Sequence, residues 1–136
     1  MEFIHEEIDK GYTELHRRES PDGRRYLTLD GNAYPSVTTV LSILSEESIA
    51  KWRAKVGDAE ANKISLRATT RGTAVHAIIE KYMNNEPDYA EGYLPHVVQS
   101  LTNIKPLLDK HVTKVYAQEV PLYSSVLQLA GTCDAV

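Results

Sequence analysis

The chain has 136 residues, of which 42% are hydrophobic and 25% charged, and these values are ordinary for a globular domain with a single core. Its formal net charge of −4 argues against a protein that coats DNA through a global positive field, and the lone Cys133 excludes an internal disulfide and a multi-cysteine zinc site. No apolar run approaches the ~20 residues that span a bilayer, and the first residues lack the basic region followed by an apolar stretch that is typical of a signal peptide. We therefore expect a cytoplasmic protein without a membrane partner.

The sequence up to residue 35 predicts an arm followed by a small hairpin. Residues 1–20 are polar and mixed, with Gly11 as a helix breaker, and we expect an irregular arm. Residues 24–35 predict a small hairpin, because Asp30-Gly31-Asn32 tolerates the positive φ angles of a tight turn and Pro35 ends the pairing.

The region 36–111 predicts a helical part. Ser36 stands where a helix N-cap belongs, and Ser45 is a second cap candidate ahead of two glutamates. Apolar residues at helical spacing predict helices over 37–44, 47–56, about 60–83 and 94–110. The longest helix has a seam of apolar or small residues that we expect to be buried: Ala61, Ile64, Ala68, Gly72, Val75, Ile79 and Tyr82.

From Thr113 onward the apolar period falls from 3.6 to 2, which predicts a hairpin over 113–136 with its turn at Tyr123-Ser124-Ser125. Helices followed by an antiparallel pair indicate the α+β class. We expect residues 1–136 to form one domain that is incomplete at its C-terminal strand.

One stretch of the long helix has the residue types of a chemical site. Gly72, His76 and Glu80 follow one another at i, i+4 and i+8, and therefore lie along one face. An imidazole one turn from a carboxylate suits a metal ligand or an oriented base, and Gly72 permits close approach of another backbone. The alternative is an ordinary surface contact between His76 and Glu80.

Lys63, Arg67 and Arg71 form a second line on the same helix. Three cations over about three turns suit a phosphate backbone. The alternative is a solvated face in which Glu60 neutralises Lys63.

Glu119 and Asp134 place one carboxylate on each strand of the C-terminal hairpin. Together with a helical histidine they could surround a divalent cation. The alternatives are an edge-strand charge for Glu119 and a turn residue for Asp134. Apolar neighbours frame Asp134, so we expect it to be buried with a cation or a cluster of donors.

Four segments occur in an order that resembles RecB-type exonucleases of the PD-(D/E)XK nuclease superfamily, in the branch of phage exonucleases and the mitochondrial genome maintenance exonuclease. They are Tyr34-Pro35-Ser36-Val37-Thr38, Arg71-Gly72-Thr73-x-x-His76-x-x-x-Glu80, Gln118-Glu119-Val120-Pro121-Leu122 and Gly131-Thr132-x-Asp134. The resemblance implies a restriction-endonuclease-like core and a DNA exonuclease that uses Mg²⁺ or Mn²⁺ on single-stranded ends.

The resemblance also implies roles for individual residues. His76 and Asp134 would be metal ligands, Glu119 would complete the catalytic set, and Glu80 would be an accessory carboxylate. The expected nucleic-acid-binding residues are Ser36, Thr38, Lys63, Arg67, Arg71 and Gly72.

In that family the next strand carries an Asp/Glu-x-Lys motif. This sequence reaches Val136 before such a strand. We therefore expect the chain alone to be inactive, as a fragment or split half of a nuclease in the cytoplasm, or the host cytoplasm if phage-encoded. Its partner would be a complementary polypeptide with that strand, or a second copy paired through 126–136. The alternative is a non-catalytic module that binds nucleic acid or protein.

Overall fold

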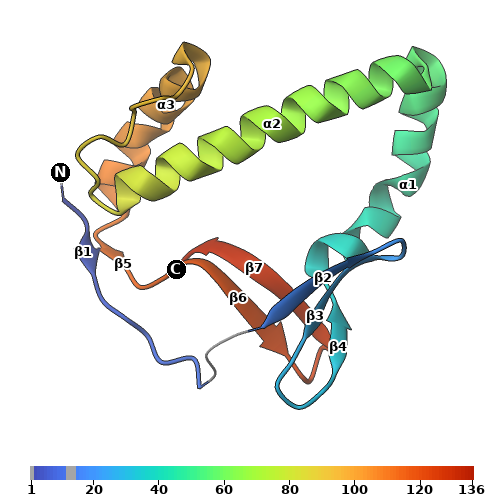
Figure 1. The fold of residues 1–136 in the computed structure, drawn as a ribbon, viewed down its shortest axis with the longest axis horizontal. Coiled ribbons are helices and arrows are strands. Elements are labelled where there is room, and N and C mark those ends of the chain that lie inside the picture. Colours follow the sequence, from blue (N-terminus) through green and yellow to red (C-terminus); the bar gives the residue numbers. More distant parts are fainter. Residues whose placement is uncertain (1, 12–14) are drawn as a thin grey trace. The chain divides into compact units, whose positions relative to one another are not determined.

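The computed structural model describes residues 2–11 and 15–136 and confirms the α+β class (Figure 1). The chain divides into two compact units: a helical unit, which comprises the residues up to Glu6 and Arg53–Tyr116, and a β unit, which comprises Glu7–Trp52 and Ala117–Val136. The helices are α1 (Val37–Val56), α2 (Asp58–Met83) and α3 (Pro95–His111). The strands are β1 (Ile4–His5), β2 (His16–Ser20), β3 (Gly23–Leu27), β4 (Ala33–Pro35), β5 (Lys114–Val115), β6 (Gln118–Ser124) and β7 (Leu129–Ala135).

The core of the helical unit lies between the C-terminal half of α2 and α3, which Figure 1 shows beside each other. Ile78 is fully buried there, and Phe3 packs edge-on against Tyr82 with ring centroids 5.4 Å apart. The buried members of this core are Phe3, Ile78, Tyr82, Met83, Val97, Leu101 and Val115. The apolar period of the sequence therefore identifies the packed faces of these two helices.

The N-terminal segment is fixed to the helical unit by hydrogen bonds distant in sequence. The backbone N–H of Phe3 donates to Oδ1 of Asn85 at 2.8 Å, and Nδ2 of Asn85 donates to the Phe3 carbonyl at 2.9 Å. β1 pairs in parallel with β5. These bonds, with burial of Phe3, explain why so short a strand is ordered.

The phenol hydroxyl of the buried Tyr82 needs a hydrogen-bond partner. Its hydroxyl donates a hydrogen bond to Asp109, and Nζ of Lys105 lies 4.8 Å from the ring centroid. Burial, and secondarily the hydrogen bond to Asp109, raises the pKa of the Tyr82 phenol far above its usual value, so the ring stays neutral.

The β unit contains the antiparallel sheet β2-β3-β4 and the hairpin β6-β7. Tyr26 is almost fully buried, and its hydroxyl shares a 2.8 Å hydrogen bond with Oγ1 of Thr132 on β7. Tyr34 stacks on Tyr123 at 6.1 Å. These aromatic contacts join the sheet to the hairpin across a small core.

A hydrogen-bonded network attaches the start of α1 to β3. Oγ of Ser36 accepts the N–H of Thr39 at 3.0 Å, which confirms the predicted N-cap, and Oγ1 of Thr39 accepts the N–H of Arg24 at 3.1 Å. Gly23 has φ +108, and a Cβ there would lie 2.4 Å from Cγ2 of Thr39. Only glycine fits this contact without displacing Thr39.

Three sequence-based expectations of local structure are wrong. Residues 16–20 of the expected irregular arm form strand β2, and the two helices expected over 37–44 and 47–56 are one helix. Oγ of Ser45 donates to the carbonyl of Ser42 at 3.1 Å, so this hydroxyl is satisfied inside the helix instead of capping a new one. The C-terminal hairpin starts at Gln118 and not at Thr113, since Lys114–Val115 pairs with β1, and its turn occupies 125–128, later than expected.

The expected buried seam of the long helix is only half correct. α2 is continuous and Ala61 near its start is buried, but residues 62–71 are all exposed, and the main core of the unit begins near Ala74. None of the three described helices has both the length and the apolar character needed to cross a bilayer.

This division of α2 generates a stability prediction. Ile78→Ala should destabilise the helical unit by about 2–5 kcal/mol, because it opens a cavity in the core. Leu66→Ala, on the 69% exposed side chain of the same helix, should change stability by less than about 0.5 kcal/mol. Urea denaturation of the two variants measures both values, and similar destabilisation of the two would contradict this packing.

Candidate functional site

The predicted carboxylates of the β unit face each other across the β6-β7 hairpin. Gln118 pairs with Ala135 and Val120 pairs with Cys133, which leaves Glu119 and Asp134 opposite each other between these two pairs. A carboxylate oxygen of Glu119 lies within 4.8 Å of one of Asp134. Both side chains are exposed, so the expectation that Asp134 is buried is wrong.

Glu119 also has an unusual backbone. Its φ of +48 lies in the left-handed region that residues with a side chain rarely adopt, although it stands inside strand β6. Such a conformation costs about 1–2 kcal/mol, and strained residues of this kind are concentrated at active sites and ligand-binding sites. The strain is thus located at one of the two facing carboxylates.

The expected nucleic-acid-binding residues Ser36 and Thr38 border a second feature of the β unit. It is a cavity of about 530 Å³ with mainly apolar walls, to which Val37, Leu122 and Leu129 contribute. Ser36 is 2% exposed, and its hydroxyl contacts both Thr38 and Thr39 besides capping α1. The geometry therefore gives Ser36 a structural role, whereas Thr38 is exposed.

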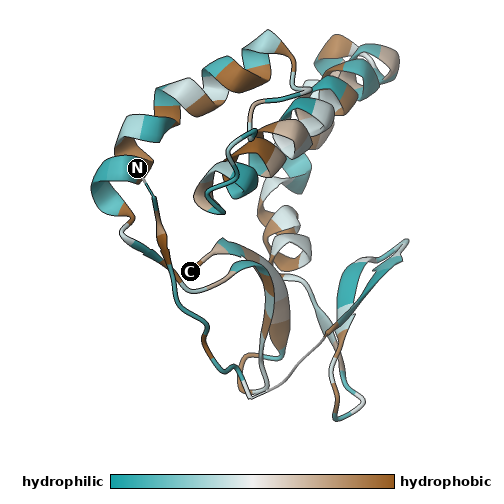
Figure 2. Cartoon of the chain, turned by 60° about the vertical axis from the view of Figure 1, so that its left-hand side comes forward, coloured by the Kyte–Doolittle hydropathy of each residue, from teal (hydrophilic) through white to brown (hydrophobic). Residues whose placement is uncertain are grey.

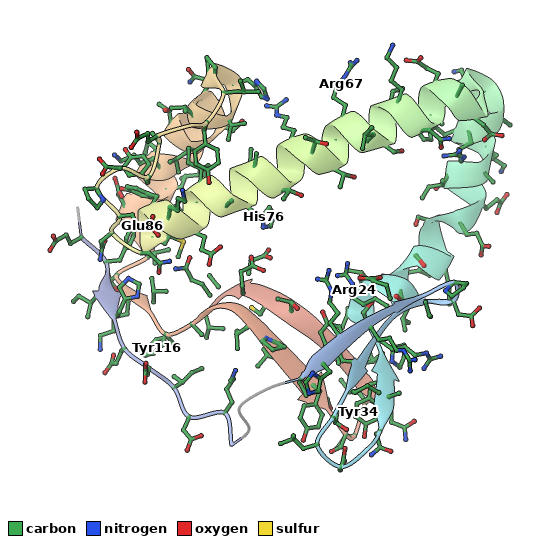
Figure 3. The ribbon with its side chains drawn as sticks, in the orientation of Figure 1. Arg24, Tyr34, Arg67, His76, Glu86 and Tyr116 are labelled. Atoms are coloured by element: carbon green, nitrogen blue, oxygen red, sulfur yellow. The ribbon has the colours of Figure 1, made fainter. Side chains whose placement is uncertain are left out.

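The predicted residues of the long helix lie along a groove in the helical unit. This groove has a volume of about 540 Å³ and is lined by Ile64, Arg67, Ala68, Arg71, Gly72, Val75, His76 and Ser100. On helical spacing, Arg67 and His76 stand about 180° apart. Figure 3 shows them on opposite sides of α2, so they form opposite rims of the groove. Nη2 of Arg71 donates to Oγ of Ser100 at 3.2 Å.

Gly72 lines this groove one turn before His76. No atom lies within 4 Å of the position that its Cβ would take, so packing within the protein does not require glycine here. Glycine inside a helix costs about 1 kcal/mol relative to alanine. Gly72 therefore leaves open space at a position where a side chain would narrow the groove.

The remaining predicted residues lie outside this groove. Lys63 is exposed and does not line it, and Glu80 is half-buried one turn beyond His76. Ser100 was not predicted, because it contacts Arg71 from another helix, 29 residues later in the sequence, and no local sequence pattern indicates that contact. The structure thus brings Arg67, Arg71, Gly72 and His76 to one groove, and Glu119 and Asp134 to one hairpin.

Comparison with known proteins gives no relative for the chain: no family model, no curated protein and no solved structure matches it.

The strained backbone of Glu119 generates a prediction. Glu119→Gly should be more stable than Glu119→Ala by about 1 kcal/mol, because glycine adopts a φ of +48 without steric cost. Both variants lack the carboxylate, so the comparison isolates the effect of the backbone. Chemical denaturation measures the difference, and an alanine variant at least as stable as the glycine variant would show that the position is unstrained.

Proposed function

We propose that this chain is the cation- and DNA-binding portion of a metal-dependent DNA exonuclease that acts on single-stranded ends. The strongest support is the pair of exposed carboxylates of Glu119 and Asp134, opposite each other on β6 and β7. The order of the sequence segments that resemble RecB-type exonucleases is the second support. The restriction-endonuclease-like core implied by that resemblance forms part of the same proposal.

The facing carboxylates fit a hard divalent cation. Mg²⁺ and Mn²⁺ prefer oxygen ligands, and for Mg²⁺ a ligand distance of about 2.1 Å puts two bound oxygens about 3 to 4 Å apart. The separation within 4.8 Å between Glu119 and Asp134 needs only a small adjustment of two exposed side chains. A cation bound there would supply an activated water and would offset charge on the phosphate.

The groove of the helical unit suits the backbone of a single strand. Arg67 and Arg71 supply two guanidinium groups on one rim, and Ser100 supplies a hydroxyl beside Arg71. Guanidinium groups pair with phosphate oxygens through parallel hydrogen bonds. At Gly72 the strand could approach the helix backbone closely.

The sequence resemblance adds His76 as a metal ligand and Glu80 as an accessory carboxylate, and both assignments belong to this proposal. His76→Ala should then lower Mn²⁺ affinity, as removal of a carboxylate ligand does. An unchanged affinity in that variant would remove His76 from the ligand set and leave the two carboxylates.

The cation proposal makes a direct prediction. Asp134→Asn should weaken Mn²⁺ binding at least tenfold, about 1.4 kcal/mol, because it removes a charged oxygen ligand. Asp22→Asn is the matched control: it changes net charge equally at an exposed turn of the same unit. Isothermal titration or Mn²⁺ electron paramagnetic resonance gives both affinities. Equal affinities in the two variants would reject a cation at the hairpin.

The groove makes a second prediction. Arg67→Gln with Arg71→Gln should weaken binding of a single-stranded oligonucleotide and reduce the slope of log K against log salt by about 0.7 for each phosphate that is no longer neutralised. Lys55→Gln with Lys110→Gln removes the same charge from exposed sites outside the groove. Fluorescence anisotropy at several salt concentrations measures the slopes, and identical slopes in the two double variants would exclude the groove.

A further inference from the structure

The hairpin formed by β2 and β3, which we call the arginine hairpin, concentrates positive charge in a chain of net charge −4. Within residues 16–25 it contains Arg17, Arg18, Arg24 and Arg25 against two acidic residues. Figure 2 shows its strands predominantly in the hydrophilic colour. The strand β2 in this hairpin was not expected, because the sequence predicted an irregular arm over residues 1–20.

Pairing sorts the four arginines onto two faces. Arg17 is opposite Tyr26, and Arg18 is opposite Arg25. Paired residues point to the same side of a sheet, and successive pairs alternate. Tyr26 is buried and bonded to Thr132, so the Arg18–Arg25 pair is on the outward face.

The inward-face arginines are neutralised and the outward pair is not. Oε1 of Glu19 accepts a hydrogen bond from Nε of Arg24 at 2.7 Å and lies 3.4 Å from Nε of Arg17. Arg18 and Arg25 are both exposed and have no ion pair with any carboxylate in residues 2–11 or 15–136. Like charges directly opposite each other destabilise a strand pair. The hairpin therefore keeps an unfavourable pair on its exposed outward face.

We infer that the outward face of the arginine hairpin binds the phosphate backbone of the DNA substrate, at a surface separate from the α2 groove. Cross-strand side chains about 5 Å apart at Cβ can engage neighbouring phosphates of one strand. The partner anion would remove the repulsion between Arg18 and Arg25. This inference rests on the proposed function.

The test compares two double variants with equal charge change in oligonucleotide binding at several salt concentrations. Arg18→Gln with Arg25→Gln should weaken binding and lower the salt slope by about 1.4, because two phosphates of a single strand are no longer neutralised. Arg17→Gln with Arg24→Gln, which removes the arginines beside Glu19, should leave the slope nearly unchanged. Equal effects of the two double variants, or no effect of the first, would overturn the inference.

A single charge reversal adds a readout that a merely structural role would not produce. Arg25→Glu replaces a repulsive cross-strand pair by an attractive one and, in the described part of the chain, loses only the exposed 3.3 Å hydrogen bond from Nη1 of Arg25 to the Ala33 carbonyl, so the melting temperature should rise while DNA affinity falls. A parallel fall in melting temperature and affinity would overturn the inference. If the Arg67/Arg71 variant binds DNA more weakly and the hairpin variants do not, the groove proposal stands and this inference fails; if the wild type itself does not bind DNA, both fail.

Discussion

The register between β6 and β7 is the constraint on which the proposed chemistry depends. Side chains alternate along a strand, so a slip of one residue would move one carboxylate to the opposite face of the hairpin. The register is fixed from outside the pair: Tyr26 bonds Thr132, Tyr34 stacks on Tyr123, and Ser36 forms a bridge with Ala130. The small aromatic core thus holds Glu119 opposite Asp134.

The helical unit reaches its local arrangement by a different route. Its main core ends near Ala74, and the α2 residues before it are held chiefly by hydrogen bonds and by the buried Ala61. Arg53 of α1 donates to Asp58 and Asn62, and acidic residues in the first turn favour the helix N-terminus. A helix that extends beyond its core leaves its arginines accessible. Gly72 stands near the point where packing starts, which is where a groove between α2 and the side of α3 becomes possible.

Much of the fold could be predicted where a local pattern determines it. The seam of α2 and the period of two after Thr113 identified the long helix and the C-terminal hairpin, and Ser36 proved to be the cap of α1. Strand β2 was missed because it has no apolar alternation; backbone pairing to β3 and the turn at Pro21-Asp22-Gly23 define it instead. That turn sequence was the available signal.

The candidate site could be predicted in part for the same reason. Glu119 and Asp134 were recognised because strand pairing follows from the hairpin, but the exposure of Asp134 depends on what covers the strand, and its apolar neighbours suggested the opposite. Ser100 and the Arg18–Arg25 pair depend on interactions between separate elements. Such interactions depend on tertiary packing, so the local spacing of apolar residues does not predict them.

The most direct test of the central claim is the crystal structure of the protein grown or soaked with Mn²⁺, with anomalous scattering used to locate the ion. We expect an anomalous peak at ligand distance, about 2.2 Å, from carboxylate oxygens of both Glu119 and Asp134. A hairpin without a peak at saturating Mn²⁺, or a peak that contacts neither carboxylate, would contradict it.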